Sequence, residues 1–117
     1  MSQLVKEITQ AEFEAEVVRA SESQPVVLDF YSTDCPPCEA LAPKYDAMAE
    51  QFAGKARFAK IFRQGNRDLA QKLGVTGSPT LVFFAGGREV GERMGGEDIR
   101  RTAIKAQVES LLAARAA

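Results

Sequence analysis

Short apolar runs predict the strands of this chain. Residues 25–31 and 80–85 are almost entirely apolar and rich in β-branched and aromatic side chains. Runs of this length and composition are typical of strands that are buried on both faces of a sheet. Weaker runs at residues 5–8 and 56–62 predict two further strands.

Apolar residues three or four positions apart predict helices between these strands. The first helix opens at Thr9, because Thr9 and Glu12 have the spacing of a capping box. Gly74 follows another periodic segment, where a glycine commonly caps a helix C-terminus. The other predicted helices cover residues 40–52, 67–73 and 97–112.

The Gly86-Gly87 pair predicts a tight hairpin, with a return strand over residues 88–94. The order of elements is therefore βαβαβαββα. Alternating strands and helices indicate parallel pairing at first, and the hairpin indicates antiparallel pairing at the end. The predicted fold class is α/β, with a central mixed sheet and helices on both faces. We expect a single domain over residues 1–117, with residues 113–117 frayed.

The composition excludes several classes of function. The chain has 117 residues, of which 26% are charged, and a net charge of −1, so it lacks the basic excess of a nucleic-acid-binding protein. It contains no histidine, which excludes Ser-His-Asp and Cys-His catalysis and histidine-ligated metals. Its two cysteines cannot complete a four-ligand zinc site within one chain. We therefore expect no bound metal.

The first residues, MSQLVKE, contain no apolar leader, and no run approaches the roughly 18 apolar residues of a membrane span. We therefore expect a cytoplasmic protein without a membrane partner, and a monomer by default. Two cysteines in such a chain favour redox chemistry over a structural disulfide framework.

The motif Cys35-Pro36-Pro37-Cys38 connects a predicted strand to a predicted helix. Two intervening residues let the sulfurs close a disulfide across one turn. At a helix N-terminus, free N–H groups and the helix dipole stabilise a thiolate, which is the nucleophile of thiol–disulfide exchange. Both prolines suit a first helical turn. The motif favours a redox pair over its alternative, an exposed or metal-binding pair.

Two segments resemble the thioredoxin family. Residues 27–38, VLDFYSTDCPPC, are similar to its active-site segment, and residues 77–84, GSPTLVFF, are similar to its cis-proline loop and the strand after it. The resemblance extends from about residue 26 to the C-terminus and implies the thioredoxin fold, in agreement with the element order. Further matching positions are Pro43, Lys60, Gly87 and Gly95.

This resemblance implies an enzyme that reduces protein disulfides, with no bound cofactor, because its electrons arrive as a dithiol. Cys35 would be the attacking thiolate, and Cys38 would resolve the mixed disulfide. Asp29 would exchange a proton with Cys38, and burial in an apolar strand should raise the pKa of its carboxyl; the alternative is a chance polar residue at a strand edge. Lys60 would lie near Asp29 and modulate it, unless it is an ordinary surface lysine.

The family pattern also implies how a substrate binds. The Ser78–Pro79 bond would be cis and would expose the Ser78 backbone for pairing with an extended substrate segment. The partners implied are proteins with disulfides and an electron donor similar to thioredoxin reductase. The expected substrate-contacting residues are Ser78, Pro79, Asp34, Pro36 and Pro37.

Three positions depart from the usual family pattern. Pro36 replaces a common glycine, Asp34 replaces a usual tryptophan, and Ser78 replaces a frequent Ile, Val or Thr. The negative charge of Asp34 disfavours a neighbouring thiolate, whereas the Ser78 hydroxyl could hydrogen-bond one. We expect a specialised member with narrower or more basic partners. The alternatives are a docking module with slow or idle cysteines, and an oxidase or isomerase of exported proteins.

Overall fold

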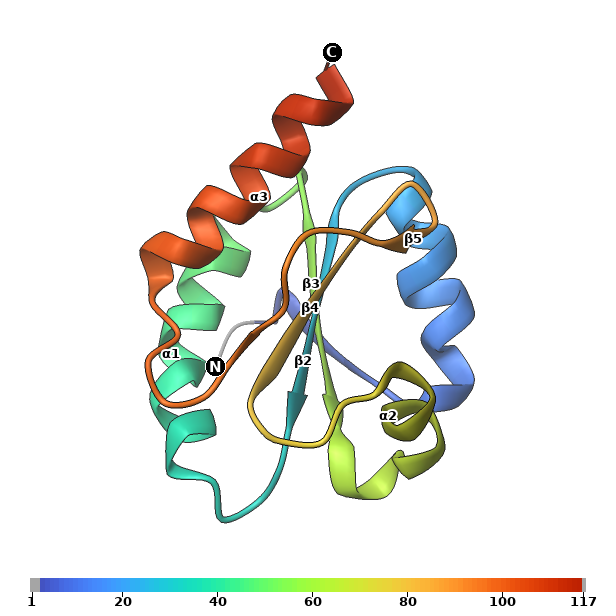
Figure 1. Ribbon diagram of the computed structural model, residues 1–117. Coiled ribbons are helices and arrows are strands. Elements are labelled where there is room, and N and C mark those ends of the chain that lie inside the picture. Colours follow the sequence, from blue (N-terminus) through green and yellow to red (C-terminus); the bar gives the residue numbers. More distant parts are fainter. Residues whose placement is uncertain (1–2, 117) are drawn as a thin grey trace.

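A mixed β-sheet forms the middle layer of the molecule (Figure 1). The computed structural model describes residues 3–116. The strands are β1 (Val5–Ile8), β2 (Val26–Tyr31), β3 (Arg57–Phe62), β4 (Thr80–Ala85), β5 (Arg88–Glu89) and β6 (Met94–Gly95). They lie in the order β1-β3-β2-β4-β5, and β6 also pairs with β4. The first three strands are parallel and the later pairings are antiparallel, which confirms the predicted mixed sheet.

Helices cover both faces of this sheet (Figure 1). On one face lie α1 (Pro36–Gln51) and α3 (Arg101–Ala116). On the other lie α2 (Arg67–Leu73) and an N-terminal helical segment. This segment consists of a 3₁₀ turn η1 (Gln10–Glu12), a π-helix η2 (Glu14–Arg19) and a 3₁₀ turn η3 (Ala20–Glu22), and a further 3₁₀ turn, η4 (Arg63–Gly65), precedes α2.

The alternation of side chains along β2 divides the core into two halves. Val26, Leu28 and Phe30 pack toward α2 and the N-terminal segment, whereas Val27 packs toward α1 and α3. Because side chains alternate along a strand, Asp29 shares the face of Val27. The single acid of this apolar strand therefore points to the side where α1 lies.

Several predicted elements have the bounds that the sequence indicated. These are the strands Val5–Ile8 and Thr80–Ala85 and the helix Arg67–Leu73, which ends at Gly74 with a left-handed φ of 71°. The strand β2 begins at Val26, one residue later than predicted. The helix α3 runs to Ala116, so residues 113–116 of the stretch expected to fray are helical, and Ala117 lies outside the described residues.

The prediction of one regular helix after Thr9 was wrong in its type. The Glu12 carboxylate accepts a hydrogen bond from Thr9 N at 2.9 Å, but the first turn closes as 3₁₀, with Glu12 N donating to Thr9 O at 3.0 Å. At the other end, the Ser21 hydroxyl donates to Val18 O at 2.6 Å. A serine hydroxyl that donates to a helix carbonyl competes with the backbone N–H groups for this acceptor. This competition favours a tight 3₁₀ ending of the helix.

Two C-terminal predictions also need correction. The expected return strand over residues 88–94 is split into β5 and β6, because Gly91 between them has a φ of 69°. The last helix begins at Arg101 and not at residue 97. The carbonyl of Arg100 accepts the first helical hydrogen bonds, and Ile99 is buried in the core ahead of the helix.

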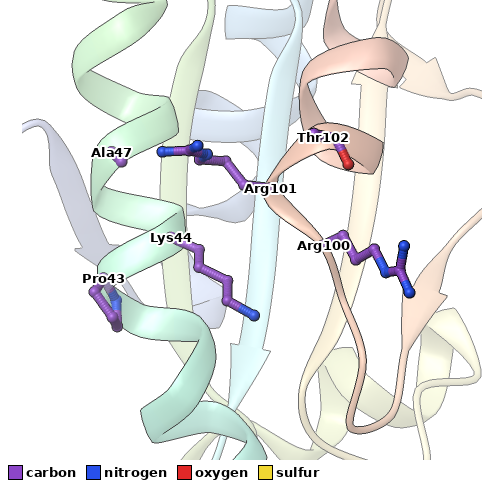
Figure 2. A pocket seen from close by; sticks show the side chains of 6 residues that line it. All are labelled: Pro43, Lys44, Ala47, Arg100, Arg101 and Thr102. Atoms are coloured by element: carbon purple, nitrogen blue, oxygen red, sulfur yellow. The ribbon is translucent and has the colours of Figure 1, made fainter.

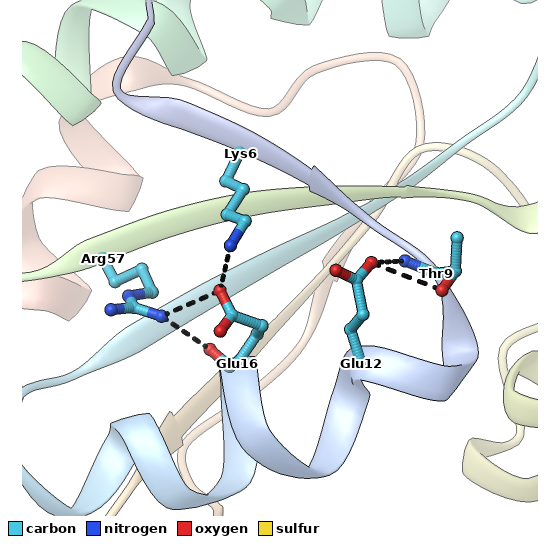
Figure 3. A network of polar contacts seen from close by, with 5 residues as sticks. All are labelled: Lys6, Thr9, Glu12, Glu16 and Arg57. Atoms are coloured by element: carbon cyan, nitrogen blue, oxygen red, sulfur yellow. Dashed lines mark hydrogen bonds and ion pairs between the residues drawn. The ribbon is translucent and has the colours of Figure 1, made fainter.

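A polar network ties the N-terminal segment to the edge of the sheet (Figure 3). Glu16 accepts from Lys6 Nζ at 2.6 Å and from Arg57 Nη1 at 3.3 Å. These cations lower the pKa of the Glu16 carboxyl, Lys6 more than Arg57. Because the groups are partly exposed, we assign the network a positioning role and little stabilisation. Within residues 3–116, no helix has the length and apolar character for crossing a membrane.

We expect Tyr45→Phe to destabilise the fold by about 1–2 kcal/mol. Tyr45 is buried between α1 and the sheet, and its hydroxyl lies 2.9 Å from Val27 O and 2.7 Å from Ala59 O. Its removal leaves buried carbonyls short of a donor. Urea unfolding measures the effect, with Tyr31→Phe as the matched control, because the Tyr31 hydroxyl donates to the exposed Glu7 carboxylate. Equal midpoints for the two variants would contradict this assignment.

Candidate active site

Cys35 is the N-cap of α1 and forms a disulfide with Cys38. The Cys38 N–H donates to Cys35 Sγ at 3.2 Å, and Pro36 and Pro37 occupy the first turn, where missing N–H groups are tolerated. The helix thus begins at Pro36, earlier than the residue-40 start that the periodicity predicted. The physical reason is that the sulfur itself caps the helix. The Cys38 N–H and the positive end of the helix dipole therefore point at Cys35 Sγ.

The loop before β4 lies against this disulfide. The Ser78–Pro79 peptide bond is cis, as the family resemblance implied. The carbonyl oxygen of Ser78 lies 3.7 Å from Cys35 Sγ, and Pro79 is buried. Cys35 therefore faces the cis-proline loop.

Asp29 lies on the other side of the disulfide, in the interior. It is 6% exposed, and its Oδ1 has no hydrogen-bond partner within the described chain. Asp29, Cys38 and Lys60 line one cavity of about 190 Å³. Burial raises the pKa of the Asp29 carboxyl to about 7, and the Lys60 charge opposes this rise. A carboxyl with this pKa can take up and release a proton near neutral pH.

Lys60 is the register partner of Asp29 across the β2–β3 pair. Its Nζ lies 5.5 Å from the centre of the Tyr31 ring. Among the ion pairs of residues 3–116, none joins Lys60 to Asp29. Lys60 therefore acts on the Asp29 carboxyl through space, across the cavity that they share.

Asp34 precedes the disulfide in a loop that the structure holds in an unusual conformation. It is exposed, and its φ of 52° lies in the left-handed region, which aspartate tolerates better than most residues. Gln64 Oε1 accepts from Thr33 N at 3.2 Å and from Thr33 Oγ1 at 3.3 Å. The loop is thus fastened to the segment that follows β3.

Arg63 is a site residue that the sequence analysis missed. Its Nε donates to Ser78 Oγ at 2.8 Å, so a guanidinium lies beside the cis-proline loop. The available signal was its place just after β3, because parallel strands end at the same edge of a sheet and β2 leads into the cysteine motif. Ser78 Oγ is the acceptor of this bond, so its O–H is still able to donate, and the expected hydrogen bond to a Cys35 thiolate stays a prediction.

A cavity of about 490 Å³ lies away from this site between α1 and α3 (Figure 2). Lys44 comes from α1, Arg101 is the first residue of α3, and Arg100 directly precedes this helix. Neither cysteine and no acidic side chain lines this cavity, so the cavity has no group for thiol chemistry. Within residues 3–116, no cluster of three His, Cys, Asp or Glu side chains could hold a metal ion.

The disulfide at a helix N-terminus, the cis-proline loop and the buried acid agree with one family of proteins. The family model described as Thioredoxin matches residues 4–110. The chain belongs to the thioredoxin family. It is 35% identical to a thioredoxin of Pseudomonas aeruginosa over 81% of this chain and 86% of that protein. It is also 35% identical to a thioredoxin of Peptoclostridium acidaminophilum over 92% of this chain and 96% of that protein.

A solved structure extends this thioredoxin assignment to three dimensions. A mutant thioredoxin from Halobacterium salinarum superimposes with a TM-score of 0.80 at 35% identity, over 96% of this chain and 95% of that chain. With the paired sulfurs of Cys35 and Cys38, these similarities identify a thiol–disulfide oxidoreductase of the thioredoxin type. They do not favour the alternative of a docking module with idle cysteines.

Proposed function

We propose that this protein reduces disulfides of cytoplasmic proteins and recovers its dithiol from an electron donor similar to thioredoxin reductase. The observation that carries the proposal is the asymmetry of the disulfide. Cys35 Sγ lies 3.7 Å from the Ser78 carbonyl on the side of the cis-proline loop, whereas Cys38 lines the inner cavity with Asp29. One sulfur is therefore suited to meet a substrate, and the other to exchange a proton.

In the first step, the Cys35 thiolate attacks one sulfur of the substrate disulfide. A mixed disulfide forms, the substrate S–S bond breaks, and the second substrate sulfur leaves as a thiolate that takes up a proton. The Cys38 N–H at 3.2 Å from Cys35 Sγ and the dipole of α1 support the thiolate before attack.

In the second step, the Cys38 thiol gives its proton to the Asp29 carboxylate and attacks Cys35 Sγ. The intramolecular disulfide forms, and the substrate leaves with both sulfurs reduced, so two electrons have passed from the enzyme to the substrate. The cavity of about 190 Å³ has room for a water that carries the proton. Lys60 modulates this transfer through its charge.

We assign substrate binding to the cis-proline loop and to the loop before α1. An extended substrate segment would pair with the Ser78 backbone beside Pro79, as a strand adds to a sheet edge. Asp34, Pro36 and Pro37 would contact the substrate around the disulfide. Asp34 is exposed where a flat apolar residue is usual, which supports a narrower range of partners. We further propose that the chain acts as a monomeric single domain.

The reduction potential of the Cys35–Cys38 pair tests the direction of electron flow. Equilibration against dithiothreitol or glutathione should give a value near or below that of thioredoxin, about −270 mV. Reduction by a thioredoxin reductase with NADPH should then sustain turnover. A potential of roughly −120 to −180 mV, the range of dedicated oxidants and isomerases, would overturn the reductase proposal in favour of a disulfide oxidase or isomerase.

A further inference from the structure

We propose that Arg63 and Arg67 form a subsite for an acidic side chain of the substrate polypeptide, next to its reacting cysteine. The proposal rests on the proposed function and names a substrate class for it, disulfides flanked by Asp or Glu. It revises the expectation of more basic partners, which considered the charge of Asp34 and not that of Arg63 and Arg67.

The position of Arg63 ties this subsite to the redox centre. Its Nε donates to Ser78 Oγ at 2.8 Å, and the carbonyl of the same serine lies 3.7 Å from Cys35 Sγ. The hydrogen bond to Ser78 leaves both Nη atoms without a hydrogen bond or an ion pair to any residue within 3–116. A half-buried guanidinium is thus held beside the substrate-pairing backbone with free donors.

A cavity of about 390 Å³ opens on this guanidinium. Its polar lining includes Arg63, Arg67, Gln64, Gln71 and Thr76, and no acidic residue lines it. Arg67 also lacks an ion pair within the described part of the chain. The cavity therefore has two positive charges, amide and hydroxyl groups, and no internal counter-charge.

This set of groups matches a carboxylate. Guanidinium groups bind carboxylates through paired, charge-assisted hydrogen bonds, and partial burial strengthens them. Two neighbouring cations without a counter-charge repel each other, so an anion between them is stabilised by both. A neutral or basic side chain gains nothing comparable there.

The substrate side chain can reach this cavity from the cis-proline loop. An extended segment paired at Ser78 would have its reacting cysteine at Cys35, and side chains near that cysteine would face Arg63. Gln64 joins the cavity wall to the loop before the disulfide through its hydrogen bonds to Thr33. Within residues 3–116, no ion pair involves the basic residues Lys44, Arg100 and Arg101 of the cavity in Figure 2, and neither cysteine lines that cavity.

The test uses disulfide-linked peptides that carry Glu, Gln or Lys in turn on either side of the reacting cysteine. We expect kcat/KM to be about ten-fold higher for Glu than for Gln at one of these positions, and lowest for Lys. We expect two variants to reduce the ratio of kcat/KM between the Glu and Gln peptides to within about two-fold. These are the single variant Arg67→Gln and the double variant with Arg63→Gln and Arg67→Gln. Arg101→Gln, in the other basic cavity, is the matched control that keeps the full ratio.

The outcomes separate this inference from the function on which it rests. Turnover of all peptides without a Glu preference would overturn the subsite and leave the proposed function in place. If inorganic phosphate then bound to the arginine pair, the cavity would be assigned to a free anion. A Glu preference that survives in the double variant would also overturn it. Failure to reduce any peptide would overturn the proposed function. Arg63 also holds Ser78, so its replacement can unfold the protein. In that case the Arg67→Gln variant alone decides whether the subsite exists.

Discussion

Cys35→Ser should lose disulfide reduction by at least about a thousand-fold, whereas Cys38→Ser should stop after the first step. Cys35 Sγ accepts the N-terminal N–H of α1 and faces the cis-proline loop, so its serine variant has no nucleophile where the substrate binds. Cys38 faces the cavity with Asp29, and its serine variant can still be attached to a substrate through Cys35.

Turnover of a protein disulfide with a dithiol as electron donor measures the loss of reduction. Non-reducing electrophoresis after incubation of each reduced variant with the protein disulfide, with the dithiol removed, detects the adduct. We expect a covalent enzyme–substrate adduct in Cys38→Ser and none in Cys35→Ser. The two variants control each other, because both remove the disulfide and leave the same fold to be tested. A stable adduct in Cys35→Ser would reverse the two assignments.

Asp29→Asn should make the protein more stable at pH 8, by up to about 4 kcal/mol, with the gain shrinking toward pH 4. The pKa of the Asp29 carboxyl is raised from 3.8 to about 7 by burial. Between these values the unfolded chain has lost the proton and the folded chain retains it, so stability falls as pH rises. Above pH 7 both states are ionised, and the full cost of the buried charge remains. Asparagine does not titrate and escapes this cost.

Urea unfolding of both proteins from pH 4 to pH 8 measures this difference. An offset that is the same at every pH would reflect only the packing of the amide and would contradict a buried titrating carboxyl. Lys60→Gln is the matched control. Loss of the cation should raise the pKa of Asp29 further and move the pH-dependent region upward, because the Lys60 charge opposes the burial effect.

The same Asp29→Asn variant should slow release of the substrate from the mixed disulfide, because the proton acceptor for Cys38 is absent. Stopped-flow measurement of this second step separates it from the initial attack by Cys35. An unchanged second step together with the expected stability change would confine Asp29 to a structural effect.

Local signals explain the predictions that succeeded. The apolar runs became β2 and β4 within one residue of the expected bounds, because a strand covered on both faces needs apolar side chains at almost every position. Gly74 ends α2 because its positive φ suits a residue without a Cβ. The cysteine motif and the acid in the apolar run were likewise visible in the sequence, since each departs sharply from its surroundings.

Other features depend on partners that local pattern does not include. The predicted start of α1 lies several residues after the observed one. The cap of this helix is the Cys35 sulfur, and the periodic apolar pattern of the helix does not extend back to it. The pairing of Asp29 with Lys60 follows from the register of β2 and β3. The split return strand depends on Gly91, whose positive φ no hydrophobic pattern reveals.

The sequence by itself determined the α/β order, the redox pair and the buried acid, because these follow from burial and from chemistry carried within a few neighbouring residues. Only the tertiary structure decided that Cys35 faces the cis-proline loop, that Cys38 shares a cavity with Asp29, and that Arg63 holds Ser78. These contacts join residues from separate strand ends and loops, and their distances are set by how the sheet and helices pack.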